Sequence, residues 1–169
     1  QTINKLVNEI IQLPALEQQM VAQGAEFWPL RLARELDDAI LDLRINELDT
    51  AVIVFKSEGD PEQVIAYDKF LEANAKHWLA REVMLKWKRV LKRVDLTSRS
   101  IVTLVEPGSC FAGALAEIAF ACDRSYMLIG QKDGDNKPPA AMSLSGGNFG
   151  SLQMHKQPLC DSIALLPRH

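Results

Sequence analysis

Residues 100–130 constrain the fold of this chain more than any other stretch. Residues 101–105 form a short apolar run rich in β-branched side chains, which is typical of a strand buried on both faces of a sheet. Turn-forming residues follow at 106–109, a helical pattern starts near Cys110, and another strand precedes Gly130. The stretch therefore predicts strand, turn, helix and strand, which is a unit of an α/β fold.

The predicted helix begins with unusually small side chains, which are Ala112, Gly113, Ala114 and Ala116. The first N–H groups of a helix have no partner within it, so they can stabilise a developing oxyanion. Glu117 is the one acid between Phe111 and Cys122, and a carboxylate at this place can move a proton. Small residues also let a helix pack closely on a sheet. The residues by themselves leave both interpretations open.

The composition fits one globular domain, since 47% of the 169 residues are hydrophobic and 24% are charged. A net charge of -3 gives no general attraction to nucleic acid, and no apolar run reaches the roughly 18 residues of a membrane span. Cys110, Cys122 and Cys160 lack the spacing of a disulfide framework or a zinc site. We therefore expect a soluble protein of the reducing cytoplasm without a signal peptide. The sequence does not begin with Met and fits a fragment of something longer.

Helical spacing of apolar residues recurs along the rest of the chain. It predicts helices at 3–12 and 15–22, separated by Pro14, then a helix at 30–45 and a long helix at about 67–94. The stripe of the third helix contains Leu32, Leu36, Ile40 and Leu43. The stripe of the long helix contains Leu79, Val83, Trp87, Val90 and Val94.

A further buried strand is predicted at 50–55, with a loop at 56–61 after it. Ligands of open α/β sheets bind outside the carboxyl ends of the strands. We therefore expect residues 56–68 and 106–117 to meet and to form the functional edge of the sheet.

Several polar features have simple interpretations. The basic face of the long helix, with Lys86, Lys88, Arg89, Lys92 and Arg93, is interpreted as solvated because the whole chain is acidic; a phosphate-bearing ligand is the alternative. Residues 132–139 and 143–151 are predicted to be irregular, and the GGNFG run lacks the residues that follow in a phosphate loop. His77, His155 and His169 do not have metal-ligand spacing.

Cys110 lies in the turn between strand and helix, where a nucleophile can be presented. No histidine is placed near it by the sequence, so we prefer the interpretation of a small packing residue.

Three segments, in order and at matching intervals, resemble the crotonase (enoyl-CoA hydratase) superfamily over about residues 25–155. They are LARELDDAILDLRINELDTAVIVFKSEGD, QVIAYDKFL and EPGSCFAGALAEIAFACDRSYML. The resemblance implies an α/β fold of the crotonase-like ββα superhelix type, here incomplete. A helical segment would occupy 1–24, the crotonase-like domain 25–155 and a C-terminal tail 156–169. Within the superfamily the likeness is greatest to ring-cleaving enzymes of aerobic benzoyl-CoA degradation, which have two crotonase-like stretches, and this chain resembles the second.

The resemblance also implies a site. The glycine-rich helix start of the superfamily matches residues 113–116, with Glu117 at the first catalytic glutamate and the Ala114 N–H as an oxyanion donor. The motif that supplies the second donor matches residues 65–68, which assigns that N–H to Ile65. Contacts to the substrate are implied for Ala66, Asp68, Cys110 and Gly113.

Two features depart from the superfamily's pattern. Tyr67 and Leu115 are bulky where room for a thioester is usual. No second glutamate follows Glu117 at the interval that the hydratases use. Asp133 and Asp135 are the nearest acids, and we assign Asp135 as the second catalytic acid.

The implied activity is the hydrolytic opening of 2,3-epoxybenzoyl-CoA to a semialdehyde acyl-CoA, with release of formate. Two N–H groups would hold the thioester carbonyl while carboxylates direct water. No metal or redox cofactor is implied. The expected partners are the acyl-CoA substrate, further copies of the chain and a first crotonase-like stretch, but neither nucleic acid nor a membrane. Two alternatives stay open: a non-catalytic structural or dimerisation half of such an enzyme, and a stand-alone enoyl-CoA hydratase-like enzyme.

Overall fold

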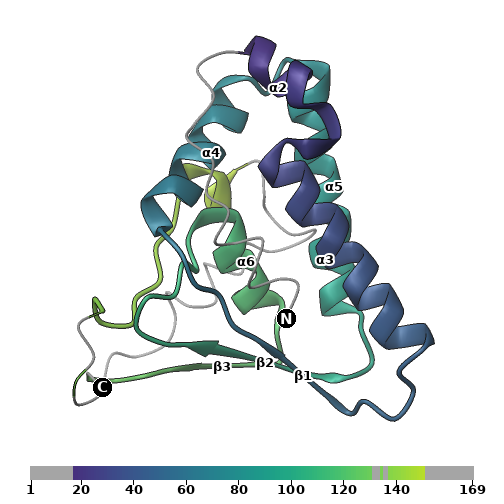
Figure 1. Ribbon diagram of the computed structural model, residues 1–169, viewed down its shortest axis with the longest axis vertical. Coiled ribbons are helices and arrows are strands. Elements are labelled where there is room, and N and C mark those ends of the chain that lie inside the picture. Colours follow the sequence, from purple (N-terminus) through teal and green to yellow (C-terminus); the bar gives the residue numbers. More distant parts are fainter. Residues whose placement is uncertain (1–16, 131–133, 135–136, 151–169) are drawn as a thin grey trace.

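The computed structural model describes residues 17–130, 134 and 137–150. In this part of the chain, helices stand on one side of a small sheet (Figure 1). The sheet consists of β1 (Val52–Phe55), β2 (Ser100–Val105) and β3 (Arg124–Met127), all parallel and in the order β1-β2-β3. The predicted α/β class is confirmed, whereas the ββα superhelix stays a prediction.

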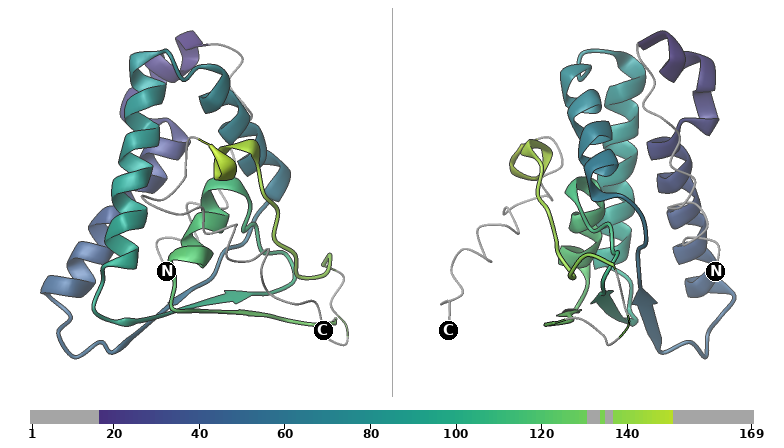
Figure 2. Two further views of the ribbon diagram at one scale, coloured as in Figure 1. Left: turned by 180° about the vertical axis from the view of Figure 1, so that it is seen from behind. Right: turned by 60° about the vertical axis from the view of Figure 1, so that its left-hand side comes forward.

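Each crossover between neighbouring strands contains helices. α4 (Pro61–Ala73) and α5 (Trp78–Asp95) connect β1 to β2, and α6 (Gly113–Ala121) connects β2 to β3. Parallel strands joined in chain order by right-handed crossovers carry all their helices on the same face. Both further views agree with this arrangement, with the sheet at one end and the helices rising from it (Figure 2).

The N-terminal described elements are α2 (Glu17–Gln23), the 3-10 turn η1 (Gly24–Glu26) and α3 (Trp28–Ile45). α3 packs along α5, and its predicted stripe is confirmed because Leu32, Leu36 and Ile40 are buried. A hydrogen bond also joins the two helices, because Trp87 Nε1 of α5 donates to the Pro29 carbonyl of α3 at 3.0 Å. The helix predicted at 3–12 and its boundary at Pro14 lie outside the described residues.

The single long helix predicted at 67–94 is wrong, because the chain forms α4 and α5 with a break between them. Asn74 ends α4, and its side chain donates to the Phe70 carbonyl at 2.8 Å. His77 begins α5, since its Nδ1 accepts from the Leu79 N–H at 3.2 Å. The side chains of Asn74 and His77 therefore end one helix and begin the next, although the apolar stripe continues across the break.

Two other predicted boundaries differ from the structure. α6 begins at Gly113 and not near Cys110, because the backbone of Ala112 is still extended, with a φ of -137° and a ψ of 150°, and the chain turns at Gly113, whose φ is 47°. Part of the glycine-rich segment predicted to be irregular forms the 3-10 turn η2 (Gly146–Phe149). A capping box formed by Ser145 and Asn148 holds that turn.

β1 and β2 are each buried on one face only, whereas all four residues of β3 are exposed. In β2, Ile101, Thr103 and Val105 are buried, while the alternating residues are half-buried or exposed. In β1, Val54 is 49% exposed. The prediction of a strand buried on both faces is therefore wrong for β2. All the described helices lie on one face of the sheet, and they bury only the side chains on that face.

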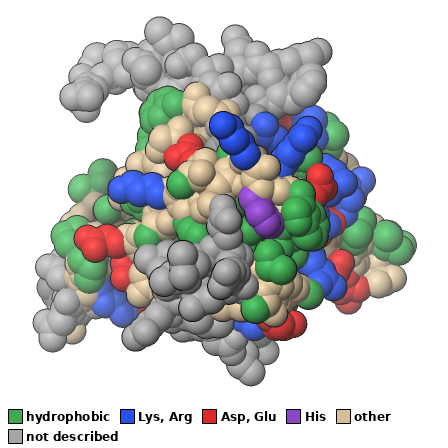
Figure 3. All heavy atoms as spheres, turned by 90° about the horizontal axis from the view of Figure 1, so that it is seen from above, with side chains coloured by type: hydrophobic (Ala, Val, Ile, Leu, Met, Phe, Trp, Pro, Cys, Tyr) green, Lys and Arg blue, Asp and Glu red, His purple; other side chains and the backbone are tan. Residues whose placement is uncertain are grey.

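The basic face of α5 is only partly solvated. Lys86 and Arg93 both form ion pairs with Asp37, a buried residue of α3. Seen from above, basic side chains gather along one side of the molecule with acidic ones among them (Figure 3). None of the described helices has the length and apolar character to cross a membrane.

Candidate functional site

The loops that follow β1 and β2 lie against each other. The Gly59 N–H donates to the Gly108 carbonyl at 3.2 Å, and the Cys110 N–H donates to Ser57 Oγ at 3.1 Å. Residues 56–68 and 106–117 therefore meet at the carboxyl edge of the sheet, as the sequence predicts.

The N-terminus of α6 is capped by a residue from another helix. Ala112, at the N-cap position, has no side chain that can accept a hydrogen bond. Asp68 of α4 takes this role, since its Oδ2 accepts from the Ala114 N–H at 2.8 Å. Asp68 is 4% exposed, so the bond is shielded from water.

Glu117 lies one turn further along α6 and is 2% exposed. Asn148 holds this carboxylate by donating from Nδ2 to Oε1 at 2.6 Å, and the same nitrogen donates to the Gly113 carbonyl at 2.9 Å. A buried carboxylate requires a partner, and the partner here comes from the glycine-rich segment.

Ser145 joins the two acids into one network. Its hydroxyl donates to Asp68 Oδ2 at 3.1 Å, and its backbone N–H donates to Asn148 Oδ1 at 2.7 Å. We call Asp68, Glu117, Ser145 and Asn148 the buried acid network. The sequence reasoning missed Ser145 and Asn148, although their spacing, Ser-x-x-Asn, resembles a capping box and was a usable signal.

Both acids of the network bind protons more readily than usual. Burial raises the pKa of Asp68 to about 7; hydrogen bonds from Ala114 and Ser145 oppose this, and the charges of Glu72 and Glu117 add to it. Burial also raises the pKa of Glu117, against the hydrogen bond from Asn148. With a pKa of about 7, the carboxyl group of Asp68 is suited to proton transfer at neutral pH.

The structure brings together four of the predicted site residues, which are Asp68, Gly113, Ala114 and Glu117. Ile65 and Ala66 lie within α4, where a backbone N–H is bound to the carbonyl four residues earlier. Ile65 and Ala114 therefore do not form an open pair of donors in this structure. Asp135, the predicted second acid, and Asp133 lie outside the described residues.

Tyr67, which is bulky, and Cys110, which is reactive when ionised, both serve in packing. Tyr67 is 3% exposed and stacks on Trp28 with ring centroids 5.0 Å apart, so it belongs to the core. Cys110 is fully buried, and burial raises the pKa of its thiol to about 11. A neutral buried thiol is a poor nucleophile, which favours the packing interpretation of Cys110.

Two small hollows lie among the described residues of this edge. One of about 10 Å³, lined by Asp68, Glu72 and Ala114 among others, has room for about one water molecule. Another of about 20 Å³ lies near Leu115. Ligand sites usually measure roughly 300–1,000 Å³, so neither of these two hollows holds an acyl-CoA group as the described residues stand.

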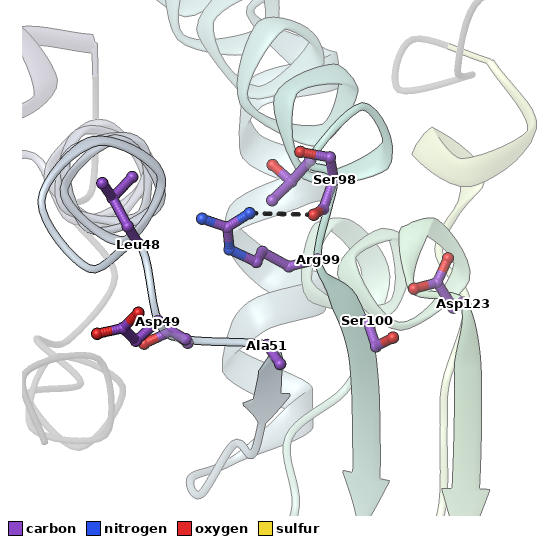
Figure 4. Close-up of a pocket in the computed structure, with 9 residues that line it drawn as sticks. Leu48, Asp49, Ala51, Ser98, Arg99, Ser100 and Asp123 are labelled. Atoms are coloured by element: carbon purple, nitrogen blue, oxygen red, sulfur yellow. Dashed lines mark hydrogen bonds between the residues drawn. The ribbon is translucent and has the colours of Figure 1, made fainter.

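A wider depression of about 620 Å³ lies at the opposite, amino edge of the sheet. There Arg99 reaches toward the loop that contains Leu48 and donates to the Ser98 carbonyl at 3.2 Å (Figure 4). Ligands of α/β sheets bind at the carboxyl edge, so we do not assign the site to this depression. Among the described residues, no three His, Cys, Asp or Glu side chains gather as a metal site would require.

No family model matches the chain. Over 133 residues, or 79% of its length, the chain is 47% identical to benzoyl-CoA-dihydrodiol lyase from Aromatoleum evansii. This similarity confirms the resemblance predicted from the sequence. The chain spans 23% of the length of that relative.

Proposed function

Because the chain is homologous to a segment of benzoyl-CoA-dihydrodiol lyase, we propose that it is part of an enzyme of this kind, acting on an aromatic acyl-CoA. The observation that supports the proposal is the 47% identity over 133 residues. The chain spans less than a quarter of the relative, so the activity, substrate and partners of the whole protein all belong to the proposal.

The proposed reaction opens 2,3-epoxybenzoyl-CoA and releases one ring carbon as formate. Two water molecules must enter, because formate and the aldehyde of the semialdehyde product together contain two more oxygen atoms than the epoxide supplies alone. In this chain, the Ala114 N–H would polarise the thioester carbonyl and Glu117 would transfer a proton to or from water. The raised pKa of Glu117 supports this role, because burial lets the carboxyl group hold a proton more readily than it would in water.

A structural role is the second candidate, and a specific observation favours it. The Ala114 N–H is bound to Asp68, and Glu117 is bound to Asn148, with all these groups buried. In this candidate the small residues of α6 serve only close packing, and the working acids belong to another part of the polypeptide.

Turnover of the natural full-length protein separates the two candidates. If Glu117 transfers a proton, Glu117→Gln should lower kcat about 100-fold or more. If α6 is structural, the same change should leave kcat within a few-fold of the wild type. Glu82→Gln, an identical change at an exposed position of α5, is the control and should leave kcat unchanged. Calorimetric titration with benzoyl-CoA adds a second measurement: the absence of binding would contradict the proposed substrate class.

A further inference from the structure

The Ala114 N–H at the start of α6 is already bound by a side chain of the protein. An acyl carbonyl would need this same N–H as its donor. Asp68 Oδ2 accepts the Ala114 N–H at 2.8 Å, and Ser145 Oγ donates to the same oxygen at 3.1 Å. A backbone amide has one hydrogen to donate. Asp68 and a ligand carbonyl therefore compete for the Ala114 N–H.

The Asp68 carboxylate lies where a ligand carbonyl bound to the Ala114 N–H would have to lie. A Cβ atom placed on Gly113 would lie 1.7 Å from Asp68 Oδ2, which shows how closely the carboxylate approaches the backbone at this point. The adjoining hollow holds about one water molecule. A thioester can reach Ala114 only after the Asp68 carboxylate has moved.

The charge on Asp68 decides the strength of this contact. An ionised carboxylate accepts a hydrogen bond about twice as strongly as a neutral group. Among the described residues, the titratable groups that face Asp68 are Glu117 of α6 and Glu72 of its own helix, both acids. From α5, the hollow beside Asp68 is lined by Met84 and Trp87, which do not titrate, and the Ser145–Gly147 segment supplies a hydroxyl and backbone groups.

We infer that Asp68 is a proton-controlled latch on the Ala114 donor, closed when its carboxyl group is ionised and released when that group takes up a proton. This inference rests on the proposed function, because the released donor would then bind the carbonyl oxygen of an aromatic acyl-CoA. The proton comes from solvent and forms an O–H bond on the carboxylate of Asp68; no other covalent bond changes. Burial raises the pKa of Asp68 to about 7, so the latch changes state near neutral pH.

Titration of the full-length protein with benzoyl-CoA at about pH 6 and about pH 8 tests the latch. The wild type should bind more tightly at the lower pH. Asp68→Asn cannot ionise, so at the higher pH it should bind roughly fivefold more tightly than the wild type, with an affinity that depends less on pH. The CoA phosphates titrate equally in both proteins, so the difference between the proteins isolates Asp68.

Glu72→Gln is the matched control, because it removes a neighbouring carboxyl group of α4 that has no hydrogen bond to Ala114. It should keep the pH dependence and move its midpoint to lower pH, since the charge of Glu72 helps to raise the pKa of Asp68. If wild type and Asp68→Asn bind benzoyl-CoA equally at both pH values, the latch is refuted and the proposed substrate stands.

The Ala114 amide signal in an NMR titration tests the latch without a ligand. Its proton shift should follow the ionisation of Asp68 in the wild type and stay constant in Asp68→Asn. If neither the wild type nor any variant binds benzoyl-CoA, the proposed substrate is refuted, and so is the release of the Ala114 N–H toward that substrate. This holds whatever the NMR signal of the Ala114 amide shows. If the Ala114 signal of the wild type stays constant, the hydrogen bond to ionised Asp68, and with it the closed state, is refuted. This result needs only the wild type, so it holds even if Asp68→Asn does not fold.

Discussion

At the scale of single residues, Glu117 illustrates what a sequence pattern can and cannot reveal. An acid in an otherwise apolar helix needs solvent, a partner or a chemical role, and this much follows from the sequence. The partner is Asn148, which lies 31 residues further along the chain. Local spacing does not predict such a pairing, because it depends on how η2 packs against α6.

Gly113 provides a test of the contact between α4 and α6. Gly113→Ala should lower the free energy of unfolding by about 3 kcal/mol or more. The new Cβ adds strain at a φ of 47° and displaces Asp68 from the Ala114 N–H. Urea denaturation measures the change.

Gly24→Ala is the control for that experiment. Gly24 has a similar φ of 50°, but no atom lies within 4 Å of an added Cβ. It should therefore show only the backbone strain of roughly 1–2 kcal/mol. Equal losses at Gly24 and Gly113 would mean that the contact with Asp68 adds nothing to stability.

At the scale of elements, α3 and α5 are held together by apolar stripes and by one buried acid. The apolar stripes were predicted correctly, with Val83, Val90 and Val94 fully buried in α5. The role of Asp37 was not predicted. Its carboxylate pairs with Lys86 and Arg93, which the sequence placed on a solvated face. A buried carboxylate between two cations costs little only while both partners are present.

Asp37→Asn should therefore lower the free energy of unfolding by about 2 kcal/mol, since Lys86 and Arg93 would lose their shared partner while remaining partly buried. Thermal or urea denaturation measures this. Asp38→Asn makes the same change at the next residue, which is exposed, and should alter stability by less than about 0.5 kcal/mol. A loss of similar size at both positions would contradict a specific role for Asp37.

At the scale of the whole molecule, the strand order determines which side chains are buried. Three parallel strands in chain order place their helices on one face, and Ile53 and Phe55 point toward that face while Val52 and Val54 are about half exposed. Val52–Phe55 are all apolar, so composition does not distinguish the two faces.

Paired substitutions in β1 test this one-sided burial. Ile53→Ala should lower the free energy of unfolding by about 2–4 kcal/mol, because it leaves a cavity beneath the helices. Val54→Ala should lower it by less than about 1 kcal/mol, since that side chain is 49% exposed. Comparable losses measured by urea denaturation would indicate that the outer face is also covered in solution.

The sequence by itself determined the alternation of helical segments and strands, the apolar stripes of α3 and α5 and the meeting of the loops after β1 and β2, but not the break between α4 and α5. These features follow from spacing within one element or from the general geometry of parallel sheets. The tertiary structure decided that α6 is capped by Asp68, 46 residues away from Ala114, and that both Asp68 and Glu117 are buried. The physical reason is that hydrogen-bond partners of buried groups are fixed by three-dimensional packing, which local periodicity does not encode.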